Sequence, residues 1–387
     1  MQKKLFNRYF ILVWFGSLCL LLIHNILNNG IPLYLDSIGF STSFSGLLGV
    51  PFALLGIVGR MLGGYLVDRR GRRMVMVGGT LLMGVAAFLL GLLPVAAAML
   101  LFRALTGVGF SSAQAAYSTA SVDVTPPEKT SLGVGIFWAA MALSVACAGY
   151  ITLGLSAGGN YRPVFVTCLI LGVLGALLSL LCNYEKGRPV SQAPKARENA
   201  RGVHSLLEKS ALKPAVVEFL VMLGVASCNS FILMFAKAQN YANQGSFLLI
   251  AAVAMAAGNL SAPALMQRLG ARNLMGVGMI VCGILYALMA LVPCQATFYL
   301  GGIGYGLSLG FSYPVLTVLT VQGSPEERRG TATSTMLMAG DIGVGLGTFF
   351  WGAVIEAMSY SAAFTLSGVS VALAGVLTFV FYLRRSR

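Results

Sequence analysis

Twelve apolar stretches dominate this 387-residue sequence, and each is long enough to cross a lipid bilayer. A membrane-spanning helix needs about 20 consecutive, mostly apolar residues. The stretches lie at residues 9–34, 44–67, 73–93, 96–121, 131–156, 161–183, 213–238, 245–267, 272–292, 295–321, 329–356 and 360–383. Only 10% of the residues are charged, whereas a soluble domain carries about 25% charge. The sequence therefore predicts an all-α membrane protein with twelve transmembrane helices.

The basic residues are distributed unevenly between the segments that connect these stretches. If the N-terminus lies in the cytoplasm, 22 of the 26 Lys and Arg fall in cytoplasmic segments, and the exceptions are Arg60, Arg103, Arg162 and Lys237. Basic residues accumulate on the cytoplasmic side of membrane proteins. We therefore expect a multi-pass protein of the bacterial inner membrane with both termini in the cytoplasm. The net charge of +14 then reflects topology and indicates no nucleic-acid partner.

The two halves of the sequence superimpose at a single ungapped offset of 199 residues. Gly71 falls on Gly270 and Gly107 falls on Gly306, for example. Duplication of a six-helix unit explains such a register, and parallel repeats of this kind occur in transporters. The sequence thus predicts two six-helix bundles, at 1–183 and 213–387, joined by a charged cytoplasmic linker at 184–212.

A glycine-rich and arginine-rich segment separates the second and third apolar stretches. It has the pattern G-x-x-x-D-R-x-G-R-R, formed by Gly64, Asp68, Arg69, Gly71, Arg72 and Arg73. This pattern resembles the loop between helices 2 and 3 of the major facilitator superfamily. The resemblance implies that Asp68 meets the start of helix 11 and stabilises one conformational state. The alternative is a positively charged loop that only sets the topology.

Polar side chains follow one face of the first apolar stretch. His24 and Asn28 lie one helical turn apart, and polar groups inside a bilayer are costly unless they face a cavity or another helix. We expect both residues to line a cavity. For Asn25 and Asn29, cavity lining and hydrogen bonding between helices are equally compatible with the sequence.

The fourth apolar stretch contains Arg103, on a face shared with Gly107, Phe110 and Gln114. Burying an arginine in a bilayer costs several kcal/mol unless it is hydrated or paired. The run from Arg103 to Gly109 resembles the helix-4 motif of proton-coupled exporters, in which the arginine is tied to proton coupling or to attraction of anions. The alternative for Arg103 is structural pairing.

The eleventh apolar stretch carries a single carboxylate near its middle. Asp341 lies on a stripe of small and polar residues with Ser334, Gly345, Thr348 and Gly352, which predicts that it faces protein. Such a residue can carry a proton across the membrane. Both charges lack a counterpart in the other half, because Arg103 falls on Gly302 and Asp341 on Ala142. The alternative for Asp341 is a permanent ion pair.

The superfamily resemblance covers the whole chain and implies a central cavity lined by helices 1, 4, 7 and 10. The candidates in the last two helices are Asn229, Tyr305 and Ser308. Tyr305 is equally compatible with a core tyrosine bonded to a neighbour. The fifth stretch departs from the antiporter pattern, because Ala148-Gly149-Tyr150 has no Gly-Pro pair.

These features predict a secondary active transporter that moves a small organic solute by alternating access. Proton-coupled efflux is the favoured function, with Asp341, Arg103 and His24 as candidates for coupling. A metabolite uptake symporter or facilitator is the alternative. A membrane enzyme is a remote third possibility, because no hydrolase motif and no cluster of carboxylates occurs. The sequence also has no phosphate-binding loop, so we expect an ion or solute gradient, and not ATP, as the energy source. We expect no catalytic residue, metal or cofactor, and partners limited to the solute, protons and the bilayer around a monomer.

Overall fold

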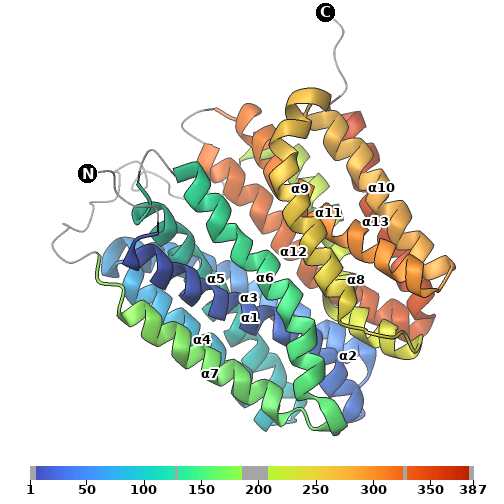
Figure 1. Cartoon of the computed structure of the whole chain (residues 1–387), viewed down its shortest axis with the longest axis horizontal. Helices are drawn as coiled ribbons and strands as arrows, with labels where there is room; N and C mark the ends of the chain where they lie inside the picture. Colours follow the sequence, from blue (N-terminus) through green and yellow to red (C-terminus); the bar gives the residue numbers. More distant parts are fainter. Residues whose placement is uncertain (1–5, 127–129, 185–207, 326–328, 383–387) are drawn as a thin grey trace, which may run out of the picture. The chain divides into compact units, whose positions relative to one another are not determined.

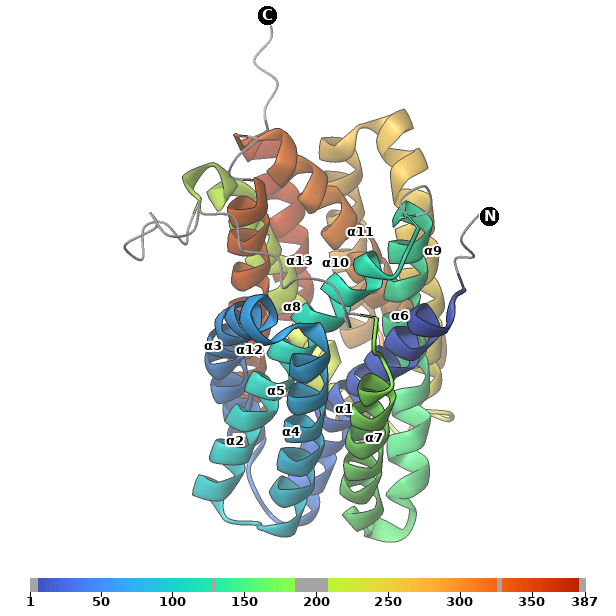
Figure 2. The same ribbon diagram turned by 90° about the vertical axis from the view of Figure 1, so that its left-hand side faces the viewer.

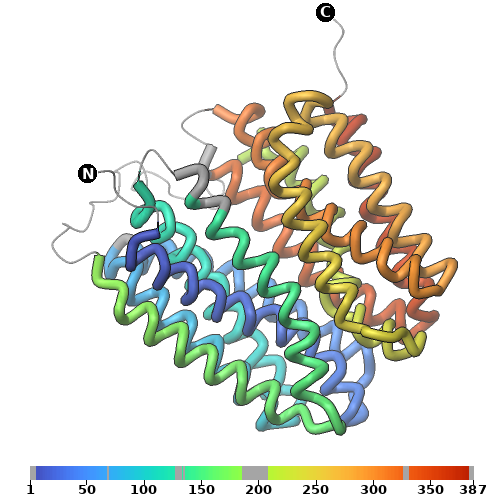
Figure 3. Tube along the Cα trace, in the orientation of Figure 1, coloured from blue at the N-terminus to red at the C-terminus, as the bar shows by residue number. Residues whose placement is uncertain are grey.

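The computed structural model describes residues 6–126, 130–184, 208–325 and 329–382. Most of the expected linker at 184–212 lies outside these residues. Within them, twelve helices are long and apolar enough to cross a membrane. Their bounds agree with the expected stretches to within a few residues, which confirms the all-helical fold with twelve spans. Grey segments in Figure 3 mark the residues that are not described.

The chain divides into two compact units, one comprising Met1–Tyr34 with Pro51–Arg197 and the other comprising Leu35–Val50 with Glu198–Arg387. The helices associated with the first unit are α1 (Arg8–Ser37), α3 (Gly49–Arg70), α4 (Arg72–Leu92), α5 (Ala96–Asp123), α6 (Thr130–Leu155) and α7 (Arg162–Leu180). Those of the second are α2 (Thr42–Leu47), α8 (Leu212–Ala238), α9 (Ser246–Leu269), α10 (Ala271–Leu291), α11 (Gln295–Gln322), α12 (Arg329–Ala357) and α13 (Tyr360–Phe381). Short 3₁₀ turns occupy Ala157–Gly159 and Lys209–Ala211.

The apolar pattern predicted one stretch at 44–67, and the structure divides it into the short helix α2 and α3. Ser41 caps α2, because the Ser41 hydroxyl accepts a hydrogen bond from the backbone N–H of Phe44 at 3.1 Å. The helix packs on α12 of the second unit, and glycines lie on both sides of the contact, at Gly46 and Gly352. A Cβ atom at Gly352 would lie 2.7 Å from the carbonyl oxygen of Thr42. Small residues at this contact let the two backbones approach closely.

The internal repeat is visible in the helix bounds. Shifted by 199 residues, α4 coincides with α10 and α5 with α11. The same pairs of neighbours recur, since α4 packs against α5 and α7 and α10 packs against α11 and α13. Figures 1 and 2 both show α4 beside α7, and α10 beside α13. Each pair meets at glycines, for a Cβ atom at Gly84 would lie 2.7 Å from the Cα atom of Gly172, and one at Gly368 would lie 2.6 Å from the carbonyl oxygen of Gly283.

The two tight turns at equivalent places of the repeat require glycine. Gly71 precedes α4 with φ 83° and ψ 165°, and Gly270 precedes α10 with φ 80° and ψ 148°. This region of backbone conformation is essentially restricted to glycine. Glycine therefore lets the chain turn sharply between α3 and α4 and again between α9 and α10.

Gly71→Ala and Gly270→Ala are each expected to lower the free energy of unfolding by about 1–3 kcal/mol, because alanine would be strained in this conformation. Thermal unfolding of the purified protein in detergent measures the effect. The matched control is Gly78→Ala, since Gly78 lies within α4 and a Cβ atom there meets nothing within 4 Å. Equal stability of the Gly71→Ala and Gly78→Ala proteins would contradict the prediction.

Candidate functional site

A buried arginine is the centre of the polar cluster in the first unit. Arg103 lies in α5 with 6% of its surface exposed. Its Nη2 atom donates a hydrogen bond of 2.6 Å to the side-chain oxygen of Asn28 on α1. Its Nη1 atom is buried and has no hydrogen-bond partner among the described residues. The guanidinium therefore keeps an unused donor at a place where burial makes such a donor costly.

The Asn28 side chain links Arg103 to His24. Because arginine can only donate, the oxygen of the Asn28 amide must face Arg103. The amide nitrogen then faces Nε2 of His24, at 3.0 Å. An amide nitrogen can only donate, so Nε2 of His24 accepts, and the imidazole proton is assigned to Nδ1. This Nδ1 atom is also buried without a partner among the described residues.

Aromatic rings enclose the same cluster. The guanidinium carbon of Arg103 lies 4.4 Å from the ring centre of Phe52, a distance typical of cation–π contacts. The His24 ring stacks on Phe110, with 4.2 Å between the ring centres. Gly107 makes room for Phe52, because a Cβ atom at Gly107 would lie 3.0 Å from the Cα atom of Phe52. The cluster thus combines a fixed positive charge, unused donors and flat apolar surfaces.

The structure brings three of the predicted cavity residues, His24, Asn28 and Arg103, into direct contact. Gln114 lies farther along α5 and is half-buried, with a side-chain oxygen that has no partner among the described residues. Asn25 instead bonds Ser144 of α6 at 2.9 Å, and the Asn29 amide donates to the carbonyl oxygen of Asn25 at 2.8 Å. These two asparagines make hydrogen bonds within and between helices.

The candidates in α8 and α11 lie inside the second unit. Tyr305 is 3% exposed, and its ring centre lies 6.0 Å from that of Phe247 on α9. The Ser308 hydroxyl is buried and donates to the carbonyl oxygen of Gly304 in its own helix, at 2.7 Å. Asn229 is partly exposed. Contact of these residues with a solute stays a prediction.

The glycines of the second span divide into two groups. Gly59 and Gly63 face α5, where Cβ atoms would lie 2.7 Å from the Cα atoms of Val108 and Ser112. A Cβ atom at Gly64 would meet nothing within 4 Å. Packing within the unit thus explains Gly59 and Gly63, whereas Gly64 belongs to the motif alone. Asp68 lies in α3, but its side chain is outside the described part, so its role stays a prediction.

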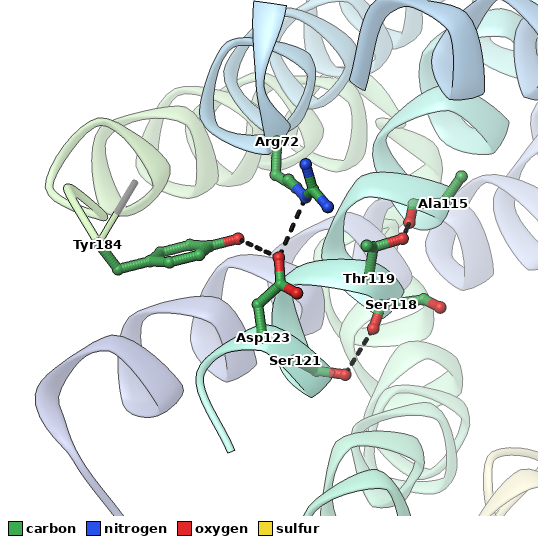
Figure 4. A network of polar contacts seen from close by, with 7 residues as sticks. All are labelled: Arg72, Ala115, Ser118, Thr119, Ser121, Asp123 and Tyr184. Atoms are coloured by element: carbon green, nitrogen blue, oxygen red, sulfur yellow. Dashed lines mark hydrogen bonds and ion pairs between the residues drawn. The ribbon is translucent and has the colours of Figure 1, made fainter. Parts of the chain in front are cut away.

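One arginine of the motif, Arg72, links the ends of α4 and α5. Nε of Arg72 lies 3.0 Å from the carboxylate of Asp123, which also accepts a hydrogen bond from the Tyr184 hydroxyl at 3.2 Å (Figure 4). Arg72 begins α4 and Asp123 ends α5. A cation at a helix N-terminus and an anion at a helix C-terminus are both unfavourable with the helix dipole, and the ion pair offsets both effects. The Arg69 guanidinium stacks on Tyr65, 4.6 Å from the ring centre.

The ion pair between Arg72 and Asp123 is expected to contribute only about 0.2–1 kcal/mol to stability, because both side chains are about a quarter exposed. A double-mutant cycle with Arg72→Gln and Asp123→Asn, followed by thermal unfolding, measures the coupling. A coupling energy several-fold larger would show that the pair is shielded from solvent and would contradict this estimate.

In the second unit, Asp341 lies on α12 and is half-buried. Three residues of the predicted stripe face protein, since Gly345, Thr348 and Gly352 contact the segment around α2. The prediction is wrong for Ser334, which is exposed near the start of α12. One neighbour of Asp341 was missed by the sequence analysis. Glu218 of α8 is fully buried, and Asp341 is close enough for the two carboxylates to interact electrostatically. The sequence did contain a signal for Glu218, because this carboxylate lies inside the expected span at 213–238.

The sequence profile of the Major Facilitator Superfamily matches residues 13–251 and 215–387, and so spans nearly the whole chain. The chain belongs to the Major Facilitator Superfamily. The two matches overlap at residues 215–251. The resemblance of the Gly64–Arg73 motif to this family is therefore confirmed.

Curated relatives and solved structures agree with this assignment. The multidrug resistance protein MdtG of Escherichia coli is 27% identical over 401 residues, covering 96% of this chain and 92% of MdtG. The nucleoside transporter NupG has a TM-score of 0.77 at 14% identity, covering 97% of this chain and all of NupG. The human organic anion transporter MFSD10 has a TM-score of 0.69 at 16% identity, covering 96% of this chain and 99% of MFSD10. At these identities the two structures establish the superfamily fold alone.

Proposed function

We propose that this protein exports a small organic solute across the bacterial inner membrane in exchange for protons, by alternating access of its two units. The observation that supports this most is the buried cluster of Arg103, Asn28, His24 and Phe52. The name of the relative MdtG, a multidrug resistance protein, supports export as the direction. The proposal includes two six-helix bundles at 1–183 and 213–387, a cytoplasmic linker at 184–212 between them, and both termini in the cytoplasm.

The chemistry of the cluster favours a solute that combines an acceptor with a flat apolar part. Arg103 is always charged, and its unused Nη1 donor can bond a carboxylate, sulfonate or carbonyl oxygen. The rings of Phe52 and Phe110 can stack on an aromatic portion of the solute. Gln114, Asn229, Tyr305 and Ser308 are proposed as further residues of the solute path.

Proton binding at His24 can change the solute site around Arg103. A proton arriving on Nε2 would place a donor against the donor nitrogen of Asn28 and break their hydrogen bond. Asn28 could then no longer hold Arg103 in the same position. Proton binding at His24 would therefore change how Arg103 presents its donors to the solute, and the two binding events would be coupled. Asp341 is proposed as the second coupling residue.

Inside-out membrane vesicles test the direction and the energy source together. A collection of labelled aromatic sulfonates, aromatic quaternary ammonium ions and nucleosides is offered outside, with the vesicle lumen made acidic. We expect accumulation of at least one sulfonate that a protonophore abolishes and that vesicles lacking the protein do not show. Accumulation only when the gradient is reversed would indicate an uptake symporter, and accumulation independent of any gradient would contradict proton coupling.

A further inference from the structure

Basic side chains gather without acidic partners at one end of the second unit. Two lie where α8 begins, one where α9 ends and one where α10 begins: Lys209, Lys213, Arg268 and Arg272. None of the four forms an ion pair with another described residue. Helices α9, α10 and α13 contain no Asp or Glu, and Glu208 at the start of α8 is buried and accepts hydrogen bonds from Ser210. The described side chains at this end therefore leave positive charge uncompensated.

The equivalent end of the first unit contains an ion pair, because Arg72 meets Asp123 at 3.0 Å. Shifted by 199 residues, these two positions are occupied by Ala271 and Gln322. The neighbouring arginine of the motif is retained, since Arg73 falls on Arg272. The second unit thus keeps a cation at this place and lacks the acid that ends α5 in the first unit.

The Arg272 side chain is held over the contact between α10 and α13. Gly276, one turn farther along α10, leaves the space that the Phe379 ring of α13 fills. The guanidinium carbon of Arg272 lies 5.2 Å from the centre of this ring, and Nη2 donates to the carbonyl oxygen of Phe379 at 3.4 Å. Its Nε atom is buried without a hydrogen-bond partner among the described residues. The guanidinium is therefore fixed in place and retains donors for an anion.

This arginine lies where hydrocarbon meets water. The spans of α10 and α13 cover Ala271–Leu291 and Tyr360–Phe381, so Arg272 and Phe379 are at their ends. The two helices lie side by side (Figures 1 and 2). Both expose apolar side chains close to this end, among them Val277, Val281, Val376 and Val380. A ligand bound at Arg272 therefore meets a cation and, beside it, a surface suited to acyl chains.

We propose that Arg272, resting on Phe379 at the end of the contact between α10 and α13, binds the phosphate of an anionic phospholipid. Guanidinium donors match phosphate oxygens in geometry and charge, and basic pockets between transmembrane helices attract anionic headgroups. Lys213 adds attraction from the α8 side of the same helix end, where its ammonium group is exposed and donates to the carbonyl oxygen of Phe381 at 3.5 Å. The assignment to the cytoplasmic leaflet rests on the topology in the proposed function, whereas lipid binding itself does not.

Native mass spectrometry of the delipidated full-length protein in detergent tests this site. Phosphatidylglycerol and phosphatidylcholine with identical acyl chains are added separately, and the bound fraction gives the affinity for each. We expect phosphatidylglycerol to bind about 30-fold more tightly, because each of the two basic residues contributes about a factor of five toward an anionic lipid. In Arg272→Gln this preference should fall to about fivefold. The matched control is Arg268→Gln, which removes an exposed arginine from the same end of the unit and should leave the preference unchanged.

A second variant separates the site from a general effect of charge. Phe379→Leu introduces the residue found at the equivalent position of the first unit, Leu180. It keeps every charge and removes the ring beneath the guanidinium, so it should also weaken binding of phosphatidylglycerol. Thermal unfolding without lipid establishes that each variant is folded. An unchanged preference in folded Arg272→Gln and Phe379→Leu, or an equal loss in Arg268→Gln, would overturn the inference.

Glycerol 3-phosphate distinguishes a lipid from a soluble phosphate. At a concentration equal to that of phosphatidylglycerol it should not displace the lipid, because it has no acyl chains to contact α10 and α13. Displacement at equal concentration would assign the site to soluble phosphates and overturn the lipid assignment. Transport is not measured in these experiments. A failure of proton exchange would therefore leave this result unaffected, and an absent lipid preference would leave the proposed function intact.

Discussion

Replacing Arg103 by methionine is expected to reduce transport by about 30-fold to several thousand-fold. Truncating one partner of a buried, hydrogen-bonded charge pair costs about 2–5 kcal/mol, and each 1.4 kcal/mol is a factor of ten in affinity. The effect should appear as a higher solute concentration for half-maximal transport. Initial rates of solute uptake into vesicles measure it.

The stability of the Arg103→Met protein distinguishes solute binding by Arg103 from a purely structural role. Methionine fills a similar volume and removes the unused Nη1 donor, so the protein should remain folded. The Asn28 oxygen loses its donor in this variant, and adding Asn28→Leu should recover stability that this loss costs. Arg103→Lys should recover transport in part, because it keeps the charge but not the planar guanidinium. The control is Arg162→Met, at the exposed start of α7. A folded Arg103→Met protein with normal transport would show that Arg103 does not bind the solute.

Replacing Asp341 by asparagine is expected to abolish accumulation of solute against its gradient while sparing movement down the gradient. A pH difference of one unit stores about 1.4 kcal/mol per proton, enough for a tenfold accumulation. Asparagine mimics the protonated form and cannot release a proton. The variant should therefore reach equal solute concentrations on both sides of the membrane. At a pH difference of one unit, the parent should accumulate solute about tenfold for each proton exchanged.

Solute binding to the Asp341→Asn protein should stay within about two-fold of the parent, because asparagine closely matches the size of a protonated aspartate and leaves every residue of the Arg103 cluster unchanged. Binding measured by protection of the detergent-solubilised protein against thermal unfolding checks this. Accumulation by Asp341→Asn equal to that of the parent would assign the coupling proton elsewhere, with His24 the next candidate.

The helices could be predicted from the sequence because hydropathy alone determines which segments fit the bilayer. The expected start of the fourth span at residue 96 coincides with that of α5. The offset of 199 residues likewise anticipated equivalent turns at Gly71 and Gly270. The division of the second stretch into α2 and α3 was not predicted, because one apolar run continues through both helices.

The candidate site could be predicted only in part. The spacing of His24 and Asn28 placed them on one face of a helix, and the cost of burying Arg103 marked it for a partner. Their mutual contact, and the ring of Phe52 beneath the guanidinium, depend on which helices are neighbours. Glu218 was overlooked because it lies only six residues after the start of α8, where a charge is usually solvated. Its burial follows from the close packing of α12, which a single sequence does not reveal.

The most direct test of proton exchange is the lumen pH of liposomes that contain the purified protein, a trapped pH-sensitive dye and a transported sulfonate at high concentration. Potassium and valinomycin hold the membrane potential at zero, and dilution starts efflux from an initially equal pH. Exchange for protons predicts that the lumen becomes more acidic as solute leaves, at a rate that follows solute loss and is absent in Asp341→Asn. Solute loss with a constant lumen pH, or with a lumen that becomes more alkaline, would contradict proton exchange.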